Sequence, residues 1–324
     1  MTTTDQVVAA HDAMADEYDR LGDVWYGHLY AQLHDVLLDV AEEMGGGKAL
    51  DAGCGTGNQA MLLAQAGFDV EGFDVSAGLL RRARHKVDQL ARPPAAPPFD
   101  GGAGPTARRF DQQHDRARRL RGGRPILSPR LAYGDILDPR SYCGAPYDLI
   151  VCVGSVLSFV DRPLEALGHM ARALRSGGRL VLEVEQRVSG DTLWGLLDGL
   201  AGGRLGVLAR PSQARRLLAR RGRSIRLRFP FPLEDGSTVE LPLWLFSVPA
   251  LERAFMDHGL SLLRREGVHI LTNLALPSSA LHRLDPESRA GRAVRVLAGL
   301  ERPLAARAPF SRLGTSLVYV LKRG

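Results

Sequence analysis

The residues best suited to chemistry lie within residues 49–60, where a short apolar run ends in Asp51 and is followed by Gly53, Gly55 and Gly57. This order of residues predicts a strand, a tight loop and a helix. Glycine lets the backbone approach a ligand without a Cβ in the way, and the N-terminus of the following helix favours a carboxylate or phosphate. The segment therefore predicts a loop that binds an anionic, adenosine-like ligand.

Two cofactors fit such a loop. Residues 55–60 match the dinucleotide-binding pattern G-x-G-x-x-A, with Asp74 at the distance of a ribose-binding acid. Residues 51–57, which include Cys54, resemble motif I of the class I S-adenosylmethionine (SAM) methyltransferases. Because Asp51 at the strand end suits a methionine ammonium better than a pyrophosphate, the SAM interpretation leads.

Two more acids follow predicted strands. Asp74 ends the predicted strand 68–73, where a carboxylate can accept both hydroxyls of a ribose. Capping the helix that begins near Ser76 is an alternative role, compatible with the first. Asp135 belongs to the carboxyl end of the predicted strand 131–136, and in the resembled family an acid at this position approaches the adenine amino group. Three strand-end acids favour SAM over a dinucleotide.

The resemblance implies a complete cofactor site. In this family N-terminal helices cover the SAM pocket, and they would supply two tyrosines here, although packing onto the core explains these aromatic residues equally well. SAM is the expected cofactor, and S-adenosylhomocysteine its product. The implied SAM-binding residues are Asp51, Gly53, Cys54, Gly55, Gly57, Asp74, Val75, Asp135, Ile136, Tyr18 and Tyr26.

The predicted elements follow the order of this family from residue 50 to residue 185. Residues 147–153 are typical of a central parallel strand buried on both faces, and a hairpin is predicted around Asp235-Gly236. The resemblance implies an α/β fold with a seven-stranded, mostly parallel, doubly wound sheet in the strand order 3-2-1-4-5-7-6. We expect one domain, residues 1–324, with N-terminal cap helices (1–48), a SAM-binding core (49–186), a substrate cap (187–247) and the C-terminal part of the core (248–324).

Two arginine-rich segments account for the net charge of +6. Residues 92–130 contain nine arginines and three aspartates, and residues 204–228 contain nine arginines and no acid. Proline, glycine and like charge at the first segment's density predict a flexible, disordered insertion over residues 92–129. Such a segment is more often a solvated tether than a phosphate-binding surface, so nucleic acid is not the expected partner.

The remaining composition gives negative expectations. The polar N-terminus predicts no signal peptide, and no apolar run approaches the ~20 residues of a membrane span. Three cysteines without C-x-x-C spacing indicate neither a disulfide framework nor a zinc site. We therefore expect a cytoplasmic protein without a metal.

The acceptor side of the site is less defined. Ser155 and Ser158 follow the central strand at the ligand-binding edge of the sheet, and Trp244 belongs to the apolar residues of the cap. Each could equally be a turn or packing residue. No histidine stands out as a general base, so the catalytic residues are unknown. The leading function is methylation of a small molecule. The alternatives are an RNA or protein methyltransferase that docks through its arginines and a non-catalytic SAM-binding regulatory protein.

Overall fold

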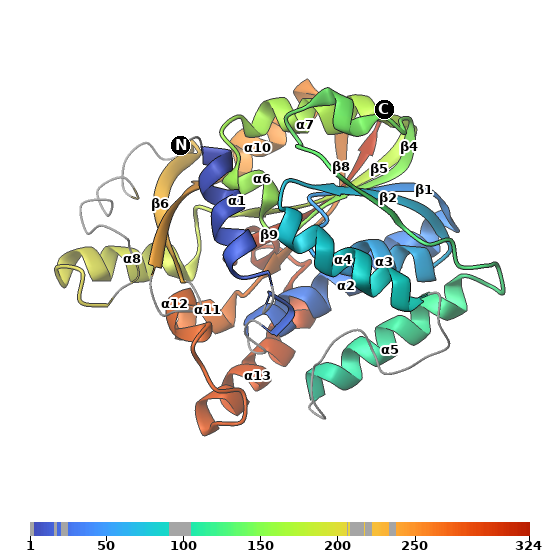
Figure 1. Cartoon of the computed structure of the whole chain (residues 1–324). Helices are drawn as coiled ribbons and strands as arrows, with labels where there is room; N and C mark the ends of the chain where they lie inside the picture. The colour runs from blue at the N-terminus through green and yellow to red at the C-terminus, as the bar shows by residue number, and fades with distance from the viewer. Residues whose placement is uncertain are drawn as a thin grey trace.

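The computed structural model describes residues 3–15, 18–20, 25–90, 105–205, 207, 217, 222–232 and 238–324. A mixed sheet crosses the centre of the molecule, and helices pack on both of its faces (Figure 1). One face is covered by α7 (Pro163–Ala173) and α10 (Val248–Asp257), and the other by α2 (Trp25–Met44) and α3 (Asn58–Gln65).

The main sheet contains β1 (Gly47–Ala52), β2 (Phe68–Asp74), β3 (Arg130–Tyr133), β4 (Tyr147–Cys152), β5 (Leu174–Glu185), β8 (Leu260–Val268) and β9 (Ser316–Arg323). Its strand order is β3-β2-β1-β4-β5-β9-β8. β9 is antiparallel to both neighbours, and all the other pairs in this sheet are parallel. The predicted doubly wound fold and strand order are confirmed. The carboxyl ends of β1 to β5 consequently meet at one edge, where open α/β sheets bind ligands.

The central strand β4 is buried on both faces, as its apolar sequence predicts. Ile150 and Cys152 belong to the core under α7 and α10, whereas Leu149 and Val151 belong to the core under α2 and α3. Side chains alternate between the two faces of a strand, so each residue of this run contributes to one of the two cores.

The other helical segments are α1 (Thr3–Ala13), η1 (Tyr18–Arg20), α4 (Ala77–Leu90), α5 (Pro105–Leu120), η2 (Pro139–Tyr142), α6 (Val156–Phe159), α8 (Gly190–Leu200), α11 (Leu271–Ala275), α12 (Ser278–Leu281), α13 (Arg289–Glu301), η4 (Arg302–Leu304) and η5 (Phe310–Arg312). Within the described residues, no helix has the length and apolar character needed to cross a membrane. The segment from α11 to α13 packs against the start of α2, because Leu281 and Val294 share an apolar cluster with Trp25.

A separate two-stranded ribbon lies after β5. β6 (Ile225–Pro232) and β7 (Thr238–Leu245) pair antiparallel, which confirms the predicted hairpin. The residues of its turn, 233–237, lie outside the described residues. Leu241 of β7 is fully buried and clusters with Ala10 and Met14 near the C-terminal end of α1. The ribbon therefore supports the N-terminal helix.

The prediction of a disordered insertion over residues 92–129 is wrong for residues 105–120, which form α5 and pack against α2 and α3. Phe110, Gln113, His114 and Ala117 are buried on this helix. Its sequence has few apolar residues, and composition alone suggested that it could not bury a face. The structure instead buries polar side chains that find hydrogen-bond partners on α2 and α3. Residues 91–104 lie outside the described part of the chain.

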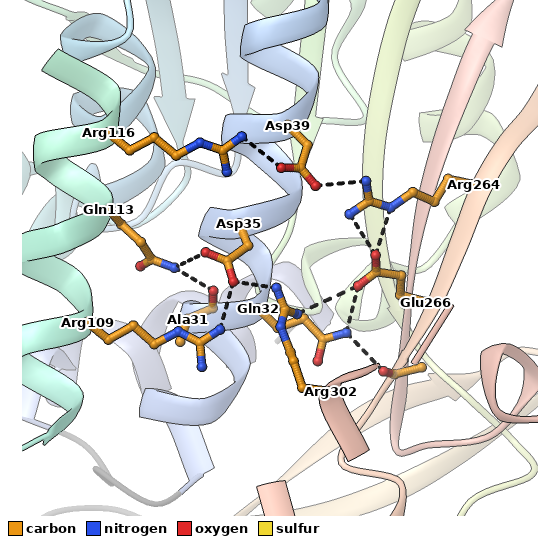
Figure 2. A network of polar contacts seen from close by, with 11 residues as sticks. Ala31, Gln32, Asp35, Asp39, Arg109, Gln113, Arg116, Arg264, Glu266 and Arg302 are labelled. Carbon is orange, nitrogen blue, oxygen red and sulfur yellow. Dashed lines mark hydrogen bonds and ion pairs between the residues drawn. The ribbon is translucent and has the colours of Figure 1, made fainter. Parts of the chain in front are cut away.

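Acidic residues of α2 anchor α5 (Figure 2). Asp35 accepts hydrogen bonds from Arg109 at 2.7 Å and from Gln113 at 2.6 Å. Asp39 pairs with Arg116 at 2.9 Å. Arg109 and Arg116 belong to the segment that was predicted to be a solvated tether, and they hold α5 against α2.

The same two acids also connect α2 to the far strand of the sheet. Asp39 pairs with Arg264 of β8 at 2.9 Å, and Asp35 pairs with Arg302 of η4. Both arginines also pair with Glu266 (Figure 2). A single ion pair at a surface contributes little to stability, whereas several charges joined in one network can contribute more.

Two buried histidines in the α2–α5 interface should make the protein sensitive to acid. Burial lowers the pKa of His34 to about 3 and that of His114 to about 4, whereas an unfolded histidine titrates near 6.5. Between pH 6.5 and about 4 the unfolded chain therefore binds more protons, so acidification in this window reduces the free energy of unfolding. Each histidine contributes up to about 1.4 kcal/mol per pH unit.

Urea unfolding of the wild type and of His114→Gln at pH 7, 6 and 5 checks this prediction. The variant should lose stability with a shallower slope, because one titrating group is gone. Carboxyl groups with a raised pKa, such as Asp51, have the opposite effect in both proteins, so only the difference between the slopes is informative. Equal slopes would show that His114 is not held neutral by the fold.

Candidate functional site

A cavity opens at the carboxyl edge of the sheet, between the loops after β1 to β4 and α1. It holds about 910 Å³ of empty space, open solvent at its mouth included. Segments far apart in the sequence meet here. Of the cofactor residues implied by the sequence, those lining the cavity are Tyr18, Gly53, Cys54, Gly55, Asp74, Val75, Asp135 and Ile136.

The glycine loop has the backbone conformation that its sequence predicts. Gly53, Gly55 and Gly57 have φ angles of 82°, 52° and 81°, a region that favours glycine. A Cβ on Gly53 would lie 2.7 Å from both methyl groups of Val156. A Cβ on Gly55 would meet no described atom closer than Leu79 at 3.9 Å, so the backbone at Gly55 is open to the cavity.

Asp74 at the end of β2 holds the loop in place. One carboxylate oxygen accepts the N–H of Gly55 at 2.8 Å, and the other accepts the N–H of Ser76 at 2.8 Å. The α4 helix is capped by Ser76, whose hydroxyl accepts the N–H of Leu79 at 3.0 Å. Ser76, and not Asp74, is therefore the N-cap residue of α4. The carboxylate of Asp74 lines the cavity. Burial raises the pKa of this carboxyl group.

Asp51 ends β1 just before the glycine loop and is 1% exposed. Its Oδ2 atom has no hydrogen-bond partner within the described structure, and burial raises the pKa of the carboxyl group to about 7. An unsatisfied buried acceptor costs about 1–3 kcal/mol. Asp51 does not itself line the cavity, so a contact with a ligand requires a bridging water or a rotation of the side chain.

Asp135 and Ile136 follow β3. The N–H of Asp135 donates to the hydroxyl of Ser141 at 2.9 Å, and Oδ1 of Asp135 accepts the N–H of Leu137 at 2.9 Å. These bonds fix a turn in which an acid and an apolar side chain face the cavity together. The pair suits a flat heterocycle that carries an amino group.

The glycine loop, the strand-end acids and the strand order are found together in one known family. A family model described as a methyltransferase domain matches residues 25–264, which is most of the chain. The chain belongs to the class I SAM-dependent methyltransferases.

Two curated relatives of this methyltransferase are named demethylmenaquinone methyltransferase. The one from Renibacterium salmoninarum is 33% identical over 98 residues, which cover 29% of this chain and 41% of the relative. The one from Paenarthrobacter aurescens is 29% identical over 136 residues, which cover 41% of this chain and 50% of the relative. The chain thus spans half or less of the length of the curated relatives it matches.

The fold resembles solved methyltransferase structures. Magnesium protoporphyrin IX methyltransferase from Synechocystis PCC 6803, with bound SAM, has a TM-score of 0.50 and 14% identity; the alignment covers 100% of this chain and 98% of the other. At this identity the likeness concerns the fold alone, and it agrees with the observed strand order.

SAM is the cofactor of this family, and the residues around the cavity fit it. The unpartnered oxygen of Asp51 suits the positive charge of an ammonium group. The open backbone at Gly55 leaves room for a ligand to approach closely. These two features come from the structure of this chain and are independent of the family match.

Three tyrosines from η1 and α2 gather beside this cavity. Tyr18 and Tyr30 line the cavity, and their side chains lie near each other. Tyr26 lies one helical turn before Tyr30, with ring centroids 6.0 Å apart, but is not part of the described lining. Burial raises the pKa of Tyr18 to about 12, so its hydroxyl keeps its proton near neutral pH. The sequence analysis missed Tyr30, although its i, i+4 spacing from Tyr26 is a usable signal.

The helix α1 forms one wall of the cavity; the sequence analysis expected N-terminal helices over the SAM pocket but named none of the residues of α1. Val7, Val8 and His11 of this helix line the cavity. Asp12 attaches α1 to the start of α4, because its Oδ1 accepts the hydroxyl of Ser76 at 2.5 Å and the N–H of Gly78 at 2.8 Å. The helix therefore depends on the same turn that presents Asp74 to the cavity.

A buried ion pair fixes η1 over the glycine loop. Oδ2 of Asp19 lies 2.6 Å from Nζ of Lys86 on α4. The other oxygen of Asp19 accepts the hydroxyl of Thr56 at 2.8 Å and the side-chain amide of Asn58 at 3.3 Å. This network positions Tyr18 next to the loop. Its members are too far apart in the sequence for spacing to reveal them.

Ser155, Ser158 and Trp244, the predicted acceptor residues, lie outside the described cavity lining. The hydroxyl of Ser155 donates to Glu185 at 2.8 Å, and its N–H donates to Glu183 at 2.5 Å. Ser158 is fully buried, and its hydroxyl accepts the N–H of Glu185 at 2.9 Å. Trp244 packs against the core under α7 and α10. In the described structure these side chains have packing and hydrogen-bonding roles.

Proposed function

We propose that this protein transfers a methyl group from SAM to a small-molecule acceptor. The observation that supports this proposal is the set of residues that line the cavity. Its glycine loop and Asp74 suit the cofactor, and the same cavity continues to Tyr30, Phe159 and Val160. Cofactor and acceptor can therefore meet in one partly enclosed space with apolar and aromatic walls, which is the usual lining of a small-molecule site.

Each strand-end acid has a distinct role in this proposal. Asp74 accepts the ribose hydroxyls, Asp135 and Ile136 hold the adenine, and Asp51 attracts the ammonium of the methionine part. SAM, when bound, supplies a methyl group that its sulfonium already activates. The protein then has to hold the acceptor in line with that methyl group, and positioning of this kind can supply about 7–11 kcal/mol. Tyr18 and Tyr30 are the polar groups best placed to orient the acceptor.

Two observations support a small molecule over a macromolecular acceptor. The curated relatives act, by name, on demethylmenaquinone. In addition, Arg109 and Arg116 of α5 pair with acids of α2, so these charges are not presented to a nucleic acid. The second arginine-rich segment, 204–228, lies largely outside the described residues.

We further propose that the cap, residues 187–247, influences the choice of acceptor through α1. Leu241 of β7 clusters with Val7 and Tyr18, and both of these residues line the cavity. A change in the ribbon can thus move the acceptor wall without touching the glycine loop.

The proposed role of Asp51 predicts that SAM affinity depends on pH. The pKa of Asp51 is about 7 in the free protein because burial disfavours its charge, whereas an ammonium partner favours the charged form. Below pH 7 SAM must displace a proton, so the dissociation constant should rise by up to about tenfold per pH unit. Calorimetry between pH 5.5 and 7.5 measures this slope. Asp51→Asn should bind SAM more weakly at pH 7.5, and its dissociation constant should depend less on pH. If the dissociation constants of the variant and the wild type change equally with pH, a group other than Asp51 causes the pH dependence.

The proposed function is tested by incubating the protein with SAM labelled in its methyl group and a panel of candidate acceptors. Mass spectrometry should find label in a small molecule and S-adenosylhomocysteine in equal amount. Calorimetry should show binding of SAM and of S-adenosylhomocysteine but not of NAD. Tight NAD binding without SAM binding would overturn the proposal. Transfer of label to RNA or protein alone would show that the acceptor is a macromolecule and not a small molecule.

A further inference from the structure

A second cluster of potential ligand atoms lies where α2, the end of β8 and the end of α13 meet. His28, His269 and Glu301 each offer one nitrogen or oxygen atom, and these three atoms lie within 4.8 Å of one another. His269 is 2% exposed and Glu301 is 1% exposed. None of the three belongs to the described lining of the SAM cavity. We propose that these side chains bind one zinc ion.

The hydrogen bonds of His269 prepare one of its nitrogens for a metal. Its Nε2 lies 3.1 Å from the backbone carbonyl of Trp25. Because a carbonyl can only accept, Nε2 carries the proton, and in the neutral ring Nδ1 has a lone pair. Metal-binding histidines commonly donate their other N–H to a carbonyl, which fixes the ring orientation. Nδ1 now accepts from the hydroxyl of Thr272 at 3.2 Å, and a metal ion would take the place of this weak partner.

The ring of His269 is also held rigidly. The indole of Trp25 stacks on it, with ring centroids 3.8 Å apart and planes 7° from parallel. The backbone of His269 has a φ of 53°, which is uncommon for a residue with a side chain. Strained residues of this kind gather at functional sites, and here the strain turns the ring from the end of β8 toward α2.

Glu301 is oriented in a comparable way. Its Oε2 accepts the N–H groups of Leu271 and Thr272 at 2.6 and 3.2 Å, at the start of α11. Its Oε1 points to His28, whose Nε2 lies 2.6 Å away. One oxygen is thus fixed by the backbone, and the other is directed at His28. A buried carboxylate is costly unless a positive charge accompanies it.

The distances allow a metal centre after small side-chain rotations. Zinc binds histidine nitrogen and carboxylate oxygen at about 2.0–2.2 Å, so tetrahedral ligand atoms lie about 3.4 Å apart. In the present structure the closest pair lies 2.6 Å apart and no separation exceeds 4.8 Å. On binding, the proton between His28 and Glu301 would move to Nδ1 of His28 or be released to solvent, so that Nε2 of His28 is free for the metal and the ligands are two neutral imidazoles and one carboxylate. The fourth position would be open to water.

Such an ion would have a structural effect on the SAM site. It would attach the segment from α11 to α13 to the first turn of α2. Tyr26 and Tyr30 are on the same helix, and Tyr30 lines the cavity. The sequence analysis expected no metal because the cysteines lack the spacing of a zinc site. His28 and Glu301 are 273 positions apart, so no local spacing indicates this site.

Metal content and thermal stability test the proposal without an assay of activity. The full chain is prepared as Cys143→Ser, because the exposed Cys143 thiol could bind zinc by itself. After removal of metal with a chelator, addition of zinc should restore about one ion per chain and raise the melting temperature by roughly 5 °C or more. His28→Ala and Glu301→Gln should each weaken zinc binding at least tenfold and abolish the thermal shift.

Two matched variants should retain zinc. His85→Gln removes an exposed histidine of α4, and Thr272→Val removes the hydroxyl that now competes for Nδ1 of His269. If the ligand variants do not fold, the Cys143→Ser protein still decides the question. A Cys143→Ser protein without zinc-dependent stabilisation would overturn the proposal and leave a direct hydrogen bond between His28 and Glu301. Zinc binding that survives in both ligand variants would also overturn it.

Discussion

Replacing Asp74 by alanine should weaken SAM binding tenfold to a hundredfold in a protein that remains folded. The carboxylate lines the cavity, and in the proposed site it accepts both ribose hydroxyls. Losing hydrogen bonds to a charged acceptor costs about 1.5–3 kcal/mol, and each 1.4 kcal/mol corresponds to a factor of ten. The variant also loses the bonds from Gly55 and Ser76, so the melting temperature should fall slightly. Calorimetry and thermal unfolding measure the two effects.

Asp69→Ala is the matched control. Asp69 lies on the same strand but is exposed and pairs with Arg130, so its loss should leave SAM affinity unchanged. Asp74→Asn should be intermediate, because an amide keeps one acceptor oxygen. Wild-type affinity in Asp74→Ala would restrict Asp74 to holding the glycine loop and would leave the ribose without its proposed partner.

Replacing Phe110 by alanine should lower the free energy of unfolding by about 3 kcal/mol. The side chain is 6% exposed and meets the ring of His34 edge-on at 5.4 Å. Truncating a buried phenylalanine typically costs 3–5 kcal/mol, and the lower end applies at an interface between a single helix and the core. Urea unfolding followed by circular dichroism gives the value.

Replacing residues 93–128 by a short linker should destabilise the protein at least as much, because it removes all of α5.

Arg118→Ala is the control for this prediction. Arg118 lies on the same helix and pairs with Asp115 in an exposed i, i+3 arrangement, which contributes little. Its loss should change stability by less than about 0.5 kcal/mol. A similarly small change in Phe110→Ala would mean that α5 does not stay docked in solution.

The helix α2 connects the separate parts of the molecule. Its acids Asp35 and Asp39 hold α5 on one side and the arginines of β8 and η4 on the other. Its first turns carry Tyr26, Tyr30 and His28. Changes in α5 or in the proposed zinc site can therefore reach the cavity through one rigid element, although neither contributes a residue to its described lining.

The sequence by itself determined the architecture, and it placed together the glycine loop and the acids that we propose to bind the cofactor. Gly53 and Gly55 precede a helix, Asp51 and Asp74 lie at the carboxyl ends of β1 and β2, and Asp135 follows β3. In a parallel sheet the carboxyl ends of neighbouring strands share one edge, so local spacing is enough to bring these residues together. The apolar pattern of β4 likewise fixed its central place.

Only the tertiary structure decided the residues that close the cavity and stabilise its surroundings. Tyr30 and α1 reach the cavity because helices fold back over the sheet, and Asp19 meets Lys86 across two elements. The packing of α5 depends on partners for buried polar groups, which composition cannot supply. His28 and Glu301 meet across 273 positions. Contacts at such separations follow from the packing of whole helices and strands, and periodicity along the sequence does not predict them.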